Sequence, residues 1–157
     1  MPTDYVSAHI DTPVGFLEVR GTSEGISTIA FLEKQPEKLE SSDVLSECIF
    51  QLQEYFDGKR KDFHDFPLRF AATQFQEEVW SELMNVPFGE VISYGELAER
   101  AGHKGAARAV GTAMNVNPLP IIIPCHRVLP ADKSLGEYAF GAGKKMWLLH
   151  HESITLL

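Results

Sequence analysis

Cysteine is scarce in this sequence. The 157 residues contain two, Cys48 and Cys125, and two cysteines in such different settings are typical of reduced thiols in a cytosolic compartment. No apolar run approaches the length of a membrane span, and the first residues lack the basic and apolar regions of a signal peptide. We therefore expect a globular protein, cytoplasmic or nuclear in a eukaryote, with no membrane partner and with either one domain or a small domain plus a subdomain.

Basic residues are also few, and they are unevenly distributed. The net charge is −8, and the total alone argues against a nucleic-acid partner. However, residues 71–99 carry six acids and no bases, whereas residues 100–151 carry seven bases and two acids. Because DNA needs only a local basic face, the second of these segments remains compatible with DNA binding, with ordinary charge scatter as the alternative.

The N-terminal part is patterned as strands followed by a helix. Three strand-like runs are separated by turn residues: Tyr5–Ile10, Gly15–Arg20 and Ile26–Leu32. Polar residues 33–43 indicate a loop. Apolar positions at helical spacing then predict a helix from about Asp43 to Phe56, with Cys48 on its core-facing side.

The charged residues 57–66 mark the expected domain boundary. It divides an N-terminal α/β subdomain, residues 1–66, from a C-terminal domain, residues 67–157. Together they make an α+β fold with a small sheet in the first part and mostly helices in the second. Pro67–Phe70 is a candidate for one more short strand.

The C-terminal domain contains a predicted helix-turn-helix. Thr73-Gln74-Phe75-Gln76 and Ser93-Tyr94-Gly95-Glu96 are capping boxes that start helices. The second of these helices should end at Ala101, and a third should run from Lys104 to about Val116, beyond a turn that contains glycine. Small residues surround Arg108 on the third helix, which favours either close approach to DNA or tight helix packing.

The segment from Ile121 to Val128 is the most informative. Three isoleucines predict a short buried strand that ends at Pro124. A lone cysteine is usually structural, but His126 and Arg127 follow Cys125 at once, and such a cationic neighbourhood is expected to lower the pKa of the thiol and make it a nucleophile. Since neighbours on an extended chain point to opposite faces, His126 should reach the thiol only through a turn or a water.

These features together resemble the O6-alkylguanine-DNA alkyltransferases. The resemblance covers residues 70–152 in order and at the family's spacing, whereas residues 1–66 fit the family's variable, RNase H-like N-terminal subdomain only loosely. The stretches that carry it are Gly89-Glu90-Val91-Ile92-Ser93-Tyr94, Ala107-Arg108-Ala109-Val110-Gly111, Asn117-Pro118, Ile123-Pro124-Cys125-His126-Arg127-Val128 and Trp147-Leu148-Leu149-His150-His151-Glu152.

The resemblance implies a catalytic relay. Cys125 would accept the alkyl group, and His126 and Glu152 would complete a Cys–water–His–Glu relay. Because a thioether is not hydrolysed, each protein molecule would act once. The resemblance also implies that the protein needs no cofactor and binds as a monomer to the minor groove of double-stranded DNA.

It also implies binding residues. Arg108 would fill the gap left by a flipped guanine, Tyr94 would push the target phosphate and hydrogen-bond the base, and Asn117 would be a hinge. The base pocket would be formed by the carbonyls of Cys125 and Val128, the backbone N–H of Ala139, and the side chains of Tyr138, Pro120 and Lys145.

Two points depart from the family. Some relatives carry a structural zinc, but His9, His64 and Cys48 do not form a recognisable ligand set, so we expect no metal. Phe140 stands where a small residue is usual, and an inward-pointing ring would narrow the pocket.

Two other functions are alternatives to alkyl transfer. One is a non-catalytic helix-turn-helix module that binds DNA lesions, and the other is a cysteine hydrolase, for which no oxyanion hole can be located.

Overall fold

The structure is a computed structural model that describes residues 5–35 and 43–156. The chain forms two compact units, Met1–Ala71 and Ala72–Leu157, and each is described by itself. In the described residues no helix is both long and apolar enough to cross a membrane.

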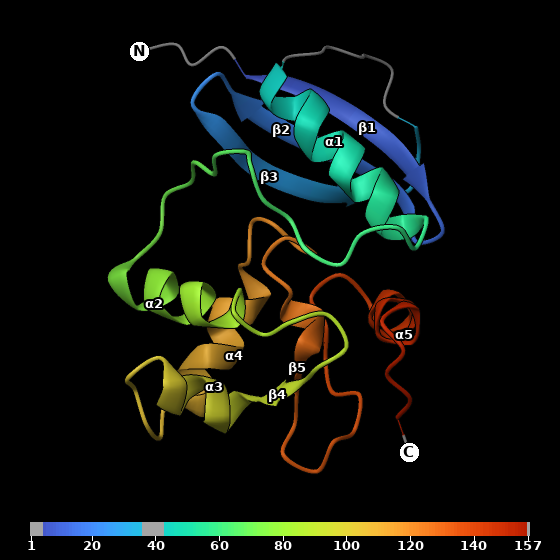
Figure 1. Cartoon of the computed structure of the whole chain (residues 1–157). Helices are drawn as coiled ribbons and strands as arrows, with labels where there is room; N and C mark the ends of the chain where they lie inside the picture. The colour runs from blue at the N-terminus through green and yellow to red at the C-terminus, as the bar shows by residue number, and fades with distance from the viewer. Residues whose placement is uncertain (1–4, 36–42, 157) are drawn as a thin grey trace. The chain divides into compact units, whose positions relative to one another are not determined.

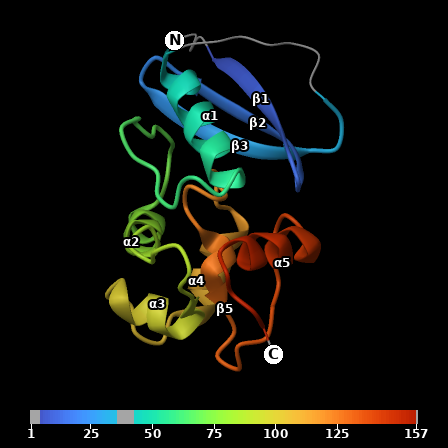
Figure 2. The same ribbon diagram turned by 45° about the vertical axis from the view of Figure 1, so that its right-hand side comes forward.

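The first unit is an antiparallel sheet with a helix packed on it (Figures 1 and 2). The sheet has the order β1-β2-β3, with β1 at Val6–Thr12, β2 at Gly15–Thr22 and β3 at Gly25–Leu32. Helix α1 spans Asp43–Phe56 and contributes Leu45, Cys48, Leu52 and Tyr55 to a core in which each is fully buried. The predicted strands and helix are confirmed, and so is the core position of Cys48. Residues 36–42 of the expected loop lie outside the described residues.

Pro67–Phe70 belongs to this unit, but it does not form the strand that was a candidate there. It makes one isolated bridge, between Leu68 and Ile26, in which Ile26 N donates to Pro67 O (2.9 Å) and Arg69 N donates to Ile26 O (2.8 Å). These bonds tie residues 67–69 to β3, so the compact units divide between Ala71 and Ala72, whereas the charged connector placed the boundary at residue 66.

The second unit is mostly helical (Figure 1). Its elements are α2 (Gln74–Leu83), β4 (Ile92–Ser93), α3 (Tyr94–Arg100), α4 (Ala107–Asn115), a 3₁₀ turn (Cys125–Arg127), β5 (Val128–Leu129) and α5 (Ala142–His151). Strands β4 and β5 pair in parallel, with Ile92 opposite Val128 and Ser93 opposite Leu129. This pairing places the start of α3 beside the turn that carries Cys125.

The helix starts follow the capping chemistry only in part. Thr73 forms the complete capping box with Gln76. Ser93 Oγ accepts from Glu96 N (3.0 Å), but the Glu96 carboxylate accepts instead from Arg100 Nη2 (2.7 Å), so the second box is half formed. Helix α4 begins at Ala107 rather than Lys104, because Gly102 and Gly105 adopt φ values of 87° and 88° that only a turn accommodates.

The predicted strand at Ile121–Ile123 is wrong. Ile121 has a φ of 79°, which is rare for a β-branched residue and interrupts any ladder. Asn117 closes the segment into a loop instead: its Oδ1 accepts from Leu119 N (2.9 Å) and its Nδ2 donates to Ile123 O (2.8 Å). Cys125 consequently lies on a 3₁₀ turn and not on an extended strand.

Candidate active site

The thiol of Cys125 is buried at the start of the 3₁₀ turn. The residue is 3% exposed, and Cys125 N donates to Ile123 O (2.7 Å). Burial raises the pKa of the thiol to about 11, although hydrogen bonds with Asn117 and Tyr138 and the charge of Lys145 act in the opposite direction. The expectation of a lowered thiol pKa is therefore wrong, and the resting group is a protonated thiol.

Arg127 does not supply the expected positive charge to the thiol because Glu152 holds its guanidinium. Arg127 Nε donates to Glu152 Oε1 (2.7 Å) and Nη2 donates to Oε2 (2.9 Å), a bidentate, charge-assisted pair. Nη1 donates to Val86 O (2.6 Å). Sequence reasoning missed this role of Arg127, and no local pattern identifies the carbonyl of Val86 as its third partner.

His126 completes the group. Its side chain is fully buried, and Nε2 lies 2.7 Å from Glu152 Oε2. Burial lowers the pKa of His126, so the imidazole is neutral. Burial disfavours the charge of Glu152, but hydrogen bonds and charge from its two partners outweigh that effect and hold the pKa of the carboxyl far below its usual range.

These protonation states fix the tautomer of His126. An ionised carboxylate can only accept, so His126 Nε2 carries the proton and donates it to Glu152. Nδ1 is then a bare acceptor, and it is buried with no hydrogen-bond partner among the described residues. An imidazole oriented in this way presents a proton acceptor from the same turn as the thiol.

Lys145 lies beneath the thiol turn on α5. Its ammonium is completely buried, and Nζ donates to Val128 O (2.9 Å) and Glu137 O (3.0 Å). Burial lowers the pKa of Lys145 to about 8, while Cys125 acts in the opposite direction. The lysine thus ties β5 to the loop that precedes α5.

The remaining predicted pocket residues are partly brought together. Asn117 and Tyr138 contact the thiol, and Pro120 is buried in a bridge with Ile123. The Tyr138 and Phe140 rings meet edge to face at 5.2 Å. Ala139 is exposed in the loop between them, and the described contacts do not join its backbone to the other pocket residues.

Tyr94 and Arg108 share a surface hollow of about 440 Å³. It is lined by α3, α4 and the loop after β5, including Gly111, Thr112, Asn115 and Glu137. A Cβ on Gly111 would lie 3.9 Å from Tyr94 Cε1, an ordinary contact distance, so the Tyr94 ring lies beside α4 at this position. Arg108 is exposed, and burial, Cys125 and Glu137 raise the pKa of Tyr94.

Among the residues that the structure describes, no group of three or more His, Cys, Asp or Glu lies together in a way that could hold a metal ion. The site therefore combines a buried thiol, a histidine–carboxylate pair and an exposed arginine on the second helix of a helical hairpin. A buried thiol beside a histidine–carboxylate pair is typical of proteins with a cysteine nucleophile, and a helical hairpin with an exposed arginine is typical of helix-turn-helix modules.

Comparisons with known proteins identify the family within this class. The model for "6-O-methylguanine DNA methyltransferase, ribonuclease-like domain" matches residues 6–70, and the model for "6-O-methylguanine DNA methyltransferase, DNA binding domain" matches residues 74–154. The chain belongs to the 6-O-methylguanine DNA methyltransferase family.

Named relatives are similar to this chain in sequence and in structure over most of its length. The methylated-DNA–protein-cysteine methyltransferase of Mycobacterium leprae is 37% identical over 94% of this chain and 92% of that protein. A Shigella flexneri protein of the same name is 46% identical, over 68% of this chain and 63% of that protein. The crystal structure of the Mycobacterium tuberculosis O6-methylguanine methyltransferase has a TM-score of 0.84 at 38% identity, covering 94% of this chain and 92% of that one. A further structure shows the M. tuberculosis protein in complex with DNA, with a TM-score of 0.83 at 39% identity, covering 94% of this chain and 91% of that one.

Proposed function

We propose that this protein repairs DNA as a methylated-DNA–protein-cysteine methyltransferase, by moving an alkyl group from O6 of guanine to Sγ of Cys125. The observation that carries the proposal is the buried thiol of Cys125 on the same turn as His126, whose Nε2 is 2.7 Å from Glu152 Oε2. O4-alkylthymine is a second candidate substrate of the same chemistry.

His126 accepts the proton of the thiol. Glu152 keeps the Nε2 proton in place, so the free acceptor is Nδ1. No direct bond between Cys125 and His126 is needed, because one water can carry the proton between them. Since burial raises the pKa of the thiol to about 11, the reactive thiolate forms only when a base is available to it.

The transfer is a single displacement at carbon. Sulfur forms a bond to the alkyl carbon, the bond from that carbon to O6 breaks, and its electron pair leaves with guanine. Tyr94 keeps its proton because its pKa is raised, so its hydroxyl can donate a hydrogen bond to the departing base. The product thioether is stable in water, and each protein acts once.

Access to the alkyl carbon requires an extruded base. Guanine cannot meet a buried sulfur while it is stacked in a duplex, and extrusion costs a few kcal/mol. The exposed Arg108 on α4 would occupy the space that the base leaves, with α4 in the minor groove. Asn117 would act as the hinge between α4 and the thiol turn, because its two hydrogen bonds close the loop that lies between them.

The base would lie among groups that include the carbonyls of Cys125 and Val128. The Val128 carbonyl already accepts from Lys145 Nζ, and its second lone pair would accept from the guanine amine. The backbone N–H of Ala139 would meet O6. Pro120, Tyr138 and Lys145 would form the walls.

The test is the mass of the cysteine peptides after reaction with a duplex that contains one O6-methylguanine. We expect one methyl on the Cys125 peptide and none on the Cys48 peptide, which serves as an internal control because Cys48 is fully buried and its pKa is raised to about 12. Cys125→Ala should bind the duplex and gain no methyl. An unmodified Cys125 together with tight binding would instead indicate a non-catalytic lesion-binding module.

As a DNA repair protein, this protein would work in the cytoplasm, or in the nucleus of a eukaryote.

A further inference from the structure

Glu137 is an acid in a place where the proposed function has no use for one. The hollow that contains Tyr94 and Arg108 is lined by eight residues. Within this described lining, Arg108 is the one base and Glu137 the one acid. The positive charge of Arg108 increases the affinity of this surface for DNA phosphates, and the negative charge of Glu137 decreases it.

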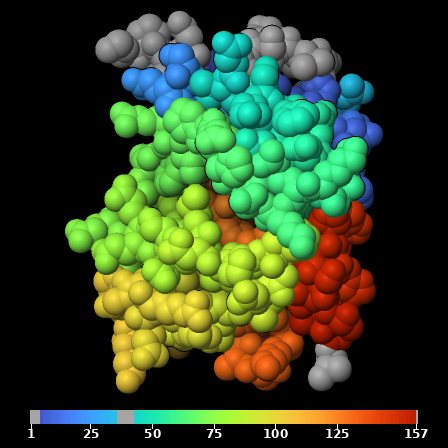
Figure 3. Space-filling view, in the orientation of Figure 1, coloured from blue at the N-terminus to red at the C-terminus, as the bar shows by residue number. Residues whose placement is uncertain are grey.

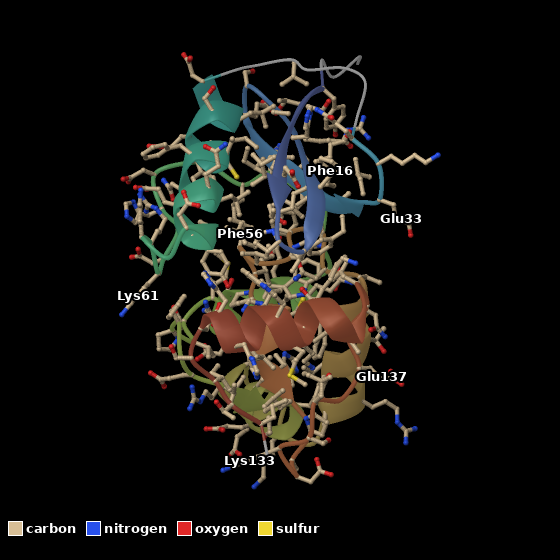
Figure 4. All side chains as sticks on the ribbon, turned by 90° about the vertical axis from the view of Figure 1, so that its right-hand side faces the viewer. Phe16, Glu33, Phe56, Lys61, Lys133 and Glu137 are labelled. Atoms are coloured by element: carbon tan, nitrogen blue, oxygen red, sulfur yellow. The ribbon has the colours of Figure 1, made fainter. Side chains whose placement is uncertain are left out.

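The backbone around Glu137 is held firmly. Its carbonyl accepts from the buried ammonium of Lys145 (3.0 Å). The preceding residue, Gly136, has a φ of 67°, and a Cβ there would come within 2.7 Å of Pro130 Cδ, so no other residue fits that position without a shift of the loop. The side chain of Glu137 therefore starts from a fixed point, at the surface of this unit (Figure 4).

The carboxylate of Glu137 also influences Tyr94, which the proposed function places against the substrate. Its negative charge contributes to raising the pKa of Tyr94, so it lies within electrostatic reach of the hydroxyl that would face the target nucleotide. The loop that carries it reaches the surface after β5, where Ala131–Ser134 are exposed (Figure 3). A DNA backbone that contacts Arg108 and Tyr94 must therefore pass near this charge.

We propose that Glu137 is a specificity-determining residue that weakens the hold of this surface on ordinary DNA phosphates. This inference rests on the proposed function. Before any base is extruded, the attraction between Arg108 and phosphates is offset by repulsion from Glu137, so that the protein leaves undamaged duplex quickly and long residence depends on an extruded base. Repulsion between exposed charges is screened by salt, so the effect belongs to low and moderate ionic strength.

The test compares Glu137→Gln with Glu82→Gln, which removes the same charge from a partly exposed position on α2 outside the hollow. Dissociation constants and dissociation rates are measured on an undamaged duplex at low and at high salt. We expect Glu137→Gln to bind about two- to fivefold more tightly and to dissociate more slowly at low salt. The gain should shrink toward unity at high salt, and Glu82→Gln should change little.

Transfer from free O6-benzylguanine is the second readout, since it needs no phosphate contact. Glu137→Gln should leave its rate unchanged. Equal tightening in both variants would reduce the effect to net charge and overturn the proposal, as would weaker duplex binding or a changed free-base rate in Glu137→Gln. Failure of the wild-type protein to accept a methyl group would overturn the proposed function while the duplex measurements remained readable.

Discussion

Replacement of Arg127 by Met removes the buried ion pair with Glu152 and leaves the thiol of Cys125 in place. Arg127 is 5% exposed, and its guanidinium is bonded to Glu152 and Val86. Its removal takes two hydrogen bonds from Glu152, at 2.7 and 2.9 Å, and one from Val86 O, at 2.6 Å. Glu152 is then a buried carboxylate that has lost its cationic partner and keeps the hydrogen bond of His126.

The expected loss of stability is large. Removing one partner of a buried ion pair costs about 3–5 kcal/mol, against a total of about 5–15 kcal/mol for an ordinary domain. Arg100→Met is the matched control, because Arg100 pairs with Glu96 on the exposed surface of α3. A pair of that kind contributes about 0.3–0.5 kcal/mol.

Arg127→Met should also change the chemistry. The positive charge of Arg127 helps to lower the pKa of His126, so its loss raises the pKa of the imidazole. Protonated His126 cannot accept the proton of the thiol. The rate of transfer from free O6-benzylguanine should therefore fall, and its rising limb should move to higher pH.

Two measurements decide the outcome. Urea unfolding gives the free energy of unfolding of each variant, and transfer rates between pH 5 and pH 9 are measured under conditions that keep the variants folded. A loss of less than about 1 kcal/mol in Arg127→Met would contradict the buried-pair argument. An unshifted pH profile would show that Arg127 stabilises the turn without controlling the protonation of His126.

The other predictions concern three different groups. Arg108→Ala should slow repair in duplex DNA much more than transfer from the free base, because only the duplex needs its gap filled; equal losses in the two assays would place Arg108 elsewhere. Phe140→Gly should raise the ratio of benzyl to methyl repair rates if the Phe140 ring, which contacts Tyr138 at 5.2 Å, narrows the pocket; an unchanged ratio refutes a steric gate. Cys125 should react with iodoacetamide at pH 8 about a hundredfold more slowly in the native than in the urea-unfolded protein, because its pKa is about 11 rather than 9.0. The native rate should rise with pH, and a native rate near the unfolded one would mean that the thiol is not protonated at rest.

Local patterns predicted the elements that local chemistry determines. The apolar spacing of α1 gave its bounds, Asp43–Phe56, because one face of the helix forms the core. The Thr73 box was correct for the same kind of reason. The half-formed box at Ser93 shows the limit, since Arg100 competes for Glu96.

The errors at the thiol turn have a different origin. β-Branched residues predict a strand only where strand partners exist, and here Asn117 uses the available backbone groups to close a loop. Arg127 is adjacent to His126 in sequence, but its charge is directed to Glu152, 25 residues away. Burial therefore determines the raised pKa of Cys125, and composition near the cysteine revealed neither that burial nor the partner of Arg127.

The bonds of Arg127 also have a consequence for the order in which the site forms. They join Arg127 to Val86, 41 positions away, and to Glu152, 25 positions away, and contacts of such separation form only after the entropy of loop closure has been paid. During synthesis, Glu152 is made after every other member of the relay. If the proposed relay operates, a nascent chain would lack the carboxylate that orients His126, and competence for alkyl transfer would arrive only when Glu152, the C-cap of α5, is made.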